Sequence, residues 1–168
     1  IAEFRKQQLA VDGVLLLPPS AWTYQDSKLL PEWDAERFPS PKQSIDAFVK
    51  HATHLSMHTL PAVAVDTTTF AELEDRGWLL CNESGDAHVF PGVPATAGKS
   101  FALLDLTHRD VLNTWSERHR HLAEEGVGAT ACDVQFDIPD NVVARGGESG
   151  AVLRSLYPAL ARRALFDA

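Results

Sequence analysis

Short apolar segments recur along the chain and are separated by longer segments with a helical pattern. Residues 11–17, 55–65 and 127–134 are dominated by apolar, β-branched and small side chains, and this composition predicts three main strands. Residues 101–106 form a shorter candidate strand. Because strands alternate with helices, the pattern indicates βα units and a mostly parallel sheet.

Four segments carry apolar side chains at helical spacing. The first helix is expected to begin at Ser40, whose side chain can cap it, with Pro41 at the first helical position. A second, short helix is expected to end at Arg76. Thr107 is expected to cap the third helix, and residues 149–166 are predicted as the fourth. The apolar face of the third helix is formed by Val111, Leu112, Trp115 and Leu122.

Three main strands are too few to close an eight-stranded βα barrel, which takes about 250 residues. The chain has 168 residues, enough for one domain with a hydrophobic core. The pattern therefore predicts an α/β fold in which residues 1–168 form part of a (β/α)8 TIM barrel.

The composition is that of a globular protein with an acidic surface. Apolar residues make up 45% of the chain and charged residues 23%, and the net charge is −8. An acidic chain does not favour a nucleic-acid partner, which would need a concentrated basic face. The short basic clusters at residues 118–120 and 162–163 are expected to be solvated helix faces.

Other features of the sequence exclude further classes. The two cysteines, Cys81 and Cys132, lack the spacing of a disulfide scaffold or a zinc site, and no cofactor is predicted. No apolar run is long enough for a membrane span. The chain starts at Ile1 without a signal peptide, which suggests a piece of a longer protein, with a cytoplasmic location as the simplest guess.

The main candidate for chemistry is Asp133, which lies at the polar end of the predicted strand of residues 127–134. In barrel enzymes the catalytic groups lie at the carboxyl ends of the strands, so Asp133 is predicted to be catalytic. A strand-end Asp is also an ordinary cap or turn residue, and this alternative stays open.

Several segments resemble glycoside hydrolase family 31, the family of α-glucosidases and α-xylosidases. Residues 33–41, WDAERFPSP, resemble the family segment W-D-x-E-R-F-P-D-P. Residues 55–61, LSMHTLP, are similar to the family strand K-V-S-L-W-I-N-P, and residues 104–108, LDLTH, to V-D-F-T-N-P.

Two later segments carry the same resemblance. Residues 125–133, EGVGATACD, resemble D-G-V-D-G-F-W-x-D, in which the last Asp is the nucleophile of the family. Residues 146–158, GGESGAVLRSLYP, resemble N-G-E-S-G-A-E-L-H-N-L-Y-P. The resemblance covers nearly the whole chain in order, and it implies roughly the N-terminal half of a catalytic (β/α)8 barrel with Asp133 as nucleophile.

The sequence departs from the family pattern at several active-site positions. Pro18 stands where the first strand usually ends in an Asp, and His58 and Leu60 replace the Trp and Asn of the second strand. Residues 134–136 replace F-G-E, and Arg154-Ser155 replaces the His-Asn pair. The general acid of the family lies on a later strand, beyond Ala168.

The resemblance implies a retaining α-glycosidase that acts on α-linked glucosides, xylosides or related sugars. Such an enzyme needs two carboxyl groups about 5–5.5 Å apart, one as nucleophile and one as acid. Asp137, Asp140 and Glu148 are local carboxylates without independent support as the second group. The departures leave two alternatives: a non-catalytic homologue that binds carbohydrate or serves in assembly, and a transglycosylase or lyase.

Two further residues are candidates for substrate binding. Trp22 could stack on a sugar face or merely anchor its loop. His58 could bind sugar or relay a proton, or be a hydrogen-bonded core histidine. A metal site at His51, His54 and His58 is disfavoured because no carboxylate completes a ligand set. The expected partners are an oligosaccharide or glycoside, and either the remainder of the barrel or a second copy, because open sheet edges favour self-association.

Overall fold

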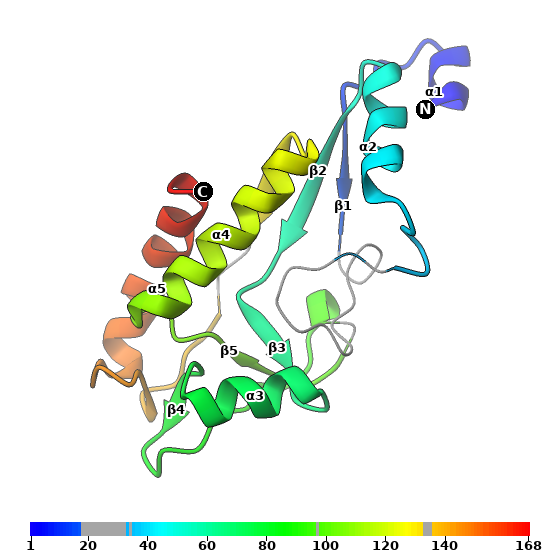
Figure 1. Cartoon of the computed structure of the whole chain (residues 1–168). Coiled ribbons are helices and arrows are strands. Elements are labelled where there is room, and N and C mark those ends of the chain that lie inside the picture. The colour runs from blue at the N-terminus through cyan, green and yellow to red at the C-terminus, as the bar shows by residue number, and fades with distance from the viewer. Residues whose placement is uncertain (18–32, 34, 97, 133–135) are drawn as a thin grey trace.

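The computed structural model describes residues 1–17, 33, 35–96, 98–132 and 136–168 (Figure 1). Short strands and longer helices follow one another along this part of the chain. The elements are α1 (Ala2–Lys6), β1 (Gly13–Leu16), α2 (Pro41–Lys50), β2 (His54–Thr59), β3 (Ala62–Ala64), α3 (Thr68–Arg76), β4 (Cys81–Asn82), the 3-10 turn η1 (Pro94–Thr96), β5 (Phe101–Leu103), α4 (Arg109–Glu125), β6 (Ala129–Cys132), β7 (Val142–Val143) and α5 (Gly150–Phe166).

The three main predicted strands form one parallel sheet in the order β1-β2-β6. In the register of the sheet, Leu16 of β1 lies beside Met57 of β2, and Thr59 of β2 lies beside Cys132 of β6. The predicted α/β fold with a parallel sheet is therefore confirmed.

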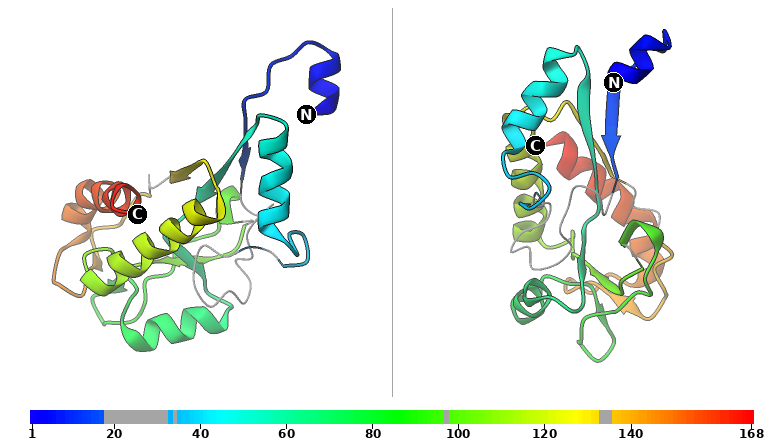
Figure 2. Two further views of the ribbon diagram at one scale, coloured as in Figure 1. Left: turned by 45° about the horizontal axis from the view of Figure 1, so that its top comes forward. Right: turned by 90° about the vertical axis from the view of Figure 1, so that its right-hand side faces the viewer.

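Side chains of β2 alternate between the two faces of this sheet. Leu55, Met57 and Thr59 are buried, whereas His58 is partly buried. The helices α2 and α4 lie on the same side of β1 and β2 in the right-hand view of Figure 2. Because Leu55 and Met57 belong to the core that these helices share, His58 lies on the opposite face of the sheet.

The prediction of one strand over residues 55–65 was wrong. The segment contains two strands, and β3 leaves the parallel sheet to pair antiparallel with β5. The break falls at Leu60 and Pro61, where Pro61 has no N–H to continue a ladder. A second antiparallel pair, β4 with β7, was not predicted, because each strand has only two residues.

Helix α2 begins at Pro41 with Ser40 at its N-cap position, as predicted, but the hydroxyl of Ser40 makes no capping hydrogen bond. The predicted cap of α4 was wrong. α4 is capped by His108, whose side chain accepts a hydrogen bond from the N–H of Asp110, while Thr107 donates its hydroxyl to Asp105. His108 takes this place because Thr107 is engaged by the preceding turn.

The second predicted helix, α3, ends at Arg76 as predicted. Thr67 accepts a hydrogen bond from the N–H of Phe70 at 3.1 Å, and Gly77 ends the helix in the left-handed region with φ of 66°. A Cβ at Gly77 would also meet the guanidinium of Arg145, a flexible side chain that could move aside. The left-handed backbone is therefore the reason that favours glycine at this position.

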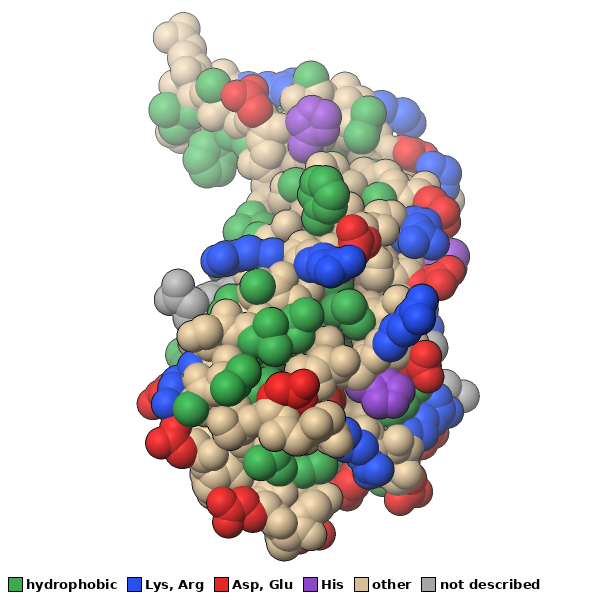
Figure 3. All heavy atoms as spheres, turned by 90° about the vertical axis from the view of Figure 1, so that its left-hand side faces the viewer, with side chains coloured by type: hydrophobic (Ala, Val, Ile, Leu, Met, Phe, Trp, Pro, Cys, Tyr) green, Lys and Arg blue, Asp and Glu red, His purple; other side chains and the backbone are tan. Residues whose placement is uncertain are grey.

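Apolar side chains are both packed inside the molecule and left at its surface. In the described residues no helix combines the length and apolarity needed to cross a membrane. Leu15 and Leu17, near the end of β1, are 47% and 53% exposed. Figure 3 shows further hydrophobic side chains in groups among charged ones on one face of the molecule.

Candidate active site

The carboxyl ends of the three parallel strands lie together at one edge of the sheet. β1 ends at Leu16, β2 at Thr59 and β6 at Cys132 (Figure 1). His58 is paired in register with Ala131, one residue before the last of β6. This edge is where a βα barrel carries its chemistry.

One of the three predicted site residues lies in the described part of the chain. His58 is brought to the strand ends on the sheet face opposite α2 and α4. Asp133 and Trp22 lie outside the described residues. Asp133 is nevertheless joined by one peptide bond to Cys132, the last residue of β6.

A buried polar pair connects the end of β2 to α4. The hydroxyl of Thr59 lies 2.9 Å from Nε2 of His119, and Nδ1 of His119 lies 2.8 Å from the carbonyl oxygen of Trp115. The imidazole also meets the indole of Trp115 edge-on, with ring centroids 4.5 Å apart. Burial lowers the pKa of His119 to about 4, although the hydrogen bond to the carbonyl works in the opposite direction.

His119 is the residue that the sequence analysis missed. The basic cluster of residues 118–120 was expected to be solvated, but His119 is 3% exposed. The signal was present in the helical spacing, because His119 lies four residues after Trp115 and three before Leu122, both of which are buried.

α5 provides a second buried contact to the same region. The hydroxyl of Tyr157 donates to the carbonyl oxygen of Leu104 at 2.9 Å and lies 3.2 Å from that of Pro61, two residues after β2. Tyr157 is fully buried, and this burial raises its pKa well above the usual value. The phenol therefore acts as a permanent donor between the turn after β2 and the strand region of β5.

Asp105 is a third buried polar group, in the segment that resembles V-D-F-T of the family. Its carboxylate accepts hydrogen bonds from the hydroxyl of Thr107 at 2.6 Å, from the N–H of Thr107 at 3.0 Å and from the N–H of Arg145 at 2.8 Å. These three donors belong to two segments of the chain, the turn before α4 and the loop before α5. The contacts tie the start of α4 to the segment that precedes α5, which is a structural role.

Three local carboxylates were considered as a second catalytic group, and one of them, Glu148, is partly buried in the segment before α5. Asp137 is exposed, and Asp140 forms an ion pair of 2.6 Å with Arg154. Arg154 also donates to the carbonyl oxygen of Ile138 at 2.8 Å. Arg154, which replaces the His of the family pattern, thus holds the loop before β7 to α5.

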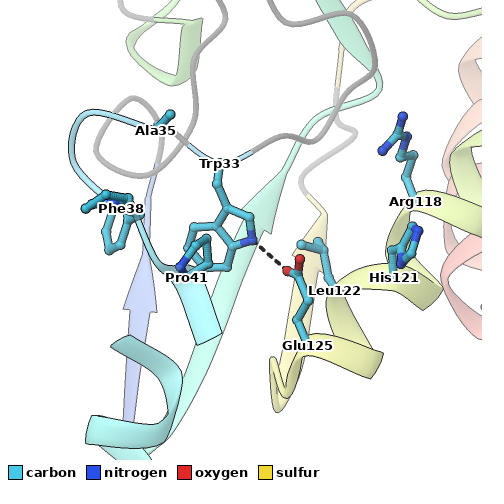
Figure 4. A pocket seen from close by; sticks show the side chains of 9 residues that line it. Trp33, Ala35, Phe38, Pro41, Arg118, His121, Leu122 and Glu125 are labelled. Atoms are coloured by element: carbon cyan, nitrogen blue, oxygen red, sulfur yellow. Dashed lines mark hydrogen bonds between the residues drawn. The ribbon is translucent and has the colours of Figure 1, made fainter. Parts of the chain in front are cut away.

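A pocket of about 370 Å³ lies between residues 33–41 and the C-terminal half of α4 (Figure 4). Within it, the indole N–H of Trp33 donates a hydrogen bond to the carboxylate of Glu125 at 2.7 Å. The ring centroids of Trp33 and Phe38 are 5.2 Å apart. Among the described residues that line this pocket, none belongs to β1, β2 or β6.

Among the described residues, no three His, Cys, Asp or Glu side chains lie close enough together to hold a metal ion. His54 and His58 stand on the same strand, while His51 ends α2.

Comparisons with known proteins identify the family. Residues 1–168 match the profile described as "Glycosyl hydrolases family 31 TIM-barrel domain". A curated relative, alpha-xylosidase XylQ of Lactiplantibacillus pentosus, is 27% identical over 108 residues, which are 64% of this chain and 14% of the relative.

Solved structures share the fold. A GH31 sulfoquinovosidase from E. rectale has a TM-score of 0.75 at 12% identity, over 97% of this chain and 25% of that chain. A GH31 alpha-xylosidase from a soil metagenome, complexed with xylose, has a TM-score of 0.73 at 19% identity, over 99% of this chain and 24% of that chain. This chain spans a minor part of the length of each relative. The chain belongs to glycosyl hydrolases family 31, and its parallel sheet is part of the TIM barrel of that family.

Proposed function

We propose that this chain carries the nucleophile of a retaining α-glycosidase, with Asp133 in that role and the general acid outside residues 1–168. One observation carries the proposal: β6 is a strand of a glycosidase-family parallel sheet, and Asp133 follows its last residue directly. Residues 1–168 are then one part of a single catalytic (β/α)8 domain.

The chemistry follows from this assignment. The carboxylate of Asp133 attacks the anomeric carbon of the sugar while the leaving oxygen takes a proton from the general acid, and water then hydrolyses the glycosyl-enzyme. Asp137 and Asp140 do not suit the acid role, because the first is exposed and the second is paired with Arg154. A later barrel strand is the natural source of the acid.

The proposed substrates are α-linked xylosides or glucosides. The curated relative is an alpha-xylosidase, and one solved relative is a complex with xylose. We assign the contacts to the sugar to Trp22 and His58. For His58 the support is its position on the sheet face away from α2 and α4, beside Ala131.

The test is hydrolysis of a panel of aryl α-glycosides by the full-length protein. Asp133→Ala should lower kcat/KM by at least about a thousandfold, because no other group can form the glycosyl-enzyme. Asp137→Asn is the matched control, since it removes an exposed carboxylate only four residues away, and it should keep most of the activity. An Asp133→Ala protein that turns over like the wild type would refute the assignment.

A second candidate function is a non-catalytic homologue that binds carbohydrate. It is favoured by the departures from the family pattern, because Leu60 is buried in the core and Arg154 is engaged with Asp140. A folded full-length protein that binds xylosides or glucosides in calorimetry, yet hydrolyses none of them, would favour this function. A transglycosylase would instead yield a new glycoside, which product analysis detects.

The partner of the open sheet is proposed to be the remainder of the barrel. Within the described residues β1 and β6 have neighbours on one side only, and Leu15 and Leu17 are exposed. Residues 1–168 produced alone are therefore expected to self-associate in size-exclusion chromatography. A monodisperse 18.4 kDa monomer that unfolds cooperatively would contradict this expectation.

A further inference from the structure

The contact between Thr59 and His119 is unusual for its position in the fold. Thr59 is the last residue of β2 and is 1% exposed, and His119 is 3% exposed. Both belong to the interface of the sheet with α4, where their neighbours Met57 and Trp115 are core side chains. A hydroxyl and an imidazole in such an interface are unfavourable unless they are hydrogen-bonded to one another or to the backbone.

The hydrogen-bond partners fix the positions of the protons. The carbonyl oxygen of Trp115 can only accept, so Nδ1 of His119 carries the proton. Nε2 is then the acceptor, and the hydroxyl of Thr59 donates to it. Both nitrogens of the neutral ring are therefore hydrogen-bonded, one to the backbone of α4 and the other to Thr59 at the end of β2.

The position of Thr59 connects this pair to the proposed nucleophile. Thr59 lies beside Cys132 in the register of the sheet, and Cys132 is bonded to Asp133. Leu55 and Met57, the other buried residues on this face of β2, are apolar. The polar contact thus occurs at the last buried position of β2, which is paired in register with the residue that precedes Asp133 in the sequence.

We propose that Thr59 and His119 are positioning residues for the carboxylate of Asp133. The inference rests on the proposed function. By fixing the end of β2 against α4, the pair fixes the backbone of β6 beside it, and hence the point from which Asp133 leaves the strand. Small displacements of a catalytic group reduce the rate of chemistry more than the binding of substrate.

The test compares two substitutions of nearly equal size in the full-length protein. Thr59→Val keeps the shape of the side chain and removes the hydroxyl, whereas Thr59→Ser keeps the hydroxyl. Thr59→Val should lower kcat about tenfold with KM changed less than about twofold, and Thr59→Ser should restore kcat to within about threefold of the wild type. Thr114→Val, which removes a hydroxyl bound to the carbonyl of Asp110 on α4, is the control and should keep the wild-type kcat.

Either of two results would overturn the proposal: a wild-type kcat in Thr59→Val, or an equal loss in Thr59→Ser, which would show that the hydroxyl is not the cause. Amide hydrogen exchange of residues 129–138 is a second measurement that needs no activity. Exchange there should be faster in Thr59→Val than in Thr59→Ser, and equal rates would contradict the proposal. If the wild type hydrolyses no glycoside, the proposed function fails, and the exchange comparison still decides whether the pair positions this segment.

Discussion

The buried ring of His119 leads to a specific expectation for stability in acid. Burial lowers the pKa of His119 from 6.5 to about 4 in the folded protein. The unfolded chain takes up a proton near pH 6.5, and the folded protein takes it up only near pH 4. Between these values the unfolded state binds more protons, so stability falls as the pH falls, and below pH 4 this group causes no further loss.

The size of the effect follows from the same shift. A pKa difference of this magnitude corresponds to a loss of about 3 kcal/mol in the free energy of unfolding once the pH is below 4. His119 is 3% exposed, so solvent screens the effect little. The loss is a large part of the stability of a typical domain.

Urea unfolding of the full-length protein between about pH 7.5 and pH 4 measures this loss. His119→Gln should be less stable than the wild type at neutral pH, because it disturbs the contacts with Thr59 and Trp115, but it should lose about 3 kcal/mol less on acidification. His121→Gln is the control: His121 is exposed and makes an exposed ion pair with Glu124, so this variant should follow the wild type. Parallel losses in the wild type and His119→Gln would refute the reasoning.

Substitutions at three further positions test the buried contacts, with urea unfolding monitored by circular dichroism. Asp105→Ala should cost about 2–4 kcal/mol, because two part-buried backbone N–H groups lose the buried carboxylate that accepts from them; a loss within experimental error would contradict this role. Tyr157→Phe should cost about 1–2 kcal/mol by removing the donor to Leu104, and Tyr157→Ala should cost clearly more because it also leaves a cavity. Gly150→Ala should cost more than about 1 kcal/mol, because the new Cβ would overlap the carbonyl of Pro139; an unchanged unfolding midpoint would show that this loop is free to move.

The parallel sheet and most helices could be predicted from local patterns. The strands β1 and β6 lie within predicted strand segments, and β2 begins one residue before its segment. Thr67 and Gly77 mark the ends of α3 by chemistry that depends only on neighbouring residues. The division of residues 55–65 into two strands could not be predicted in this way. The apolar run continues across the break, and the partner of β3 lies some forty residues later, in β5.

Part of the candidate site could likewise be predicted from local sequence, and part of it could not. The strand end before Asp133 is visible in the sequence because a carboxylate follows an apolar run. His119 was assigned to a solvated face because Arg118 and Arg120 flank it, although helical spacing places it between Trp115 and Leu122. Its hydrogen bond to Thr59 joins residues sixty positions apart, and only the tertiary packing of α4 on β2 brings them together.

The positions that match the family and the positions that depart from it have different physical roles. Asp105 and Tyr157 stand in matching segments, and both are fully buried with hydrogen bonds to the backbone of distant loops, so replacing either leaves buried groups unsatisfied. His58 and Arg154 stand at departures: one is partly buried at the strand ends, and the other forms a half-exposed ion pair with its loop. Changes at such positions need not disturb the core. The departures are therefore compatible with an intact fold. We expect them to change the binding of sugar rather than the stability of the domain.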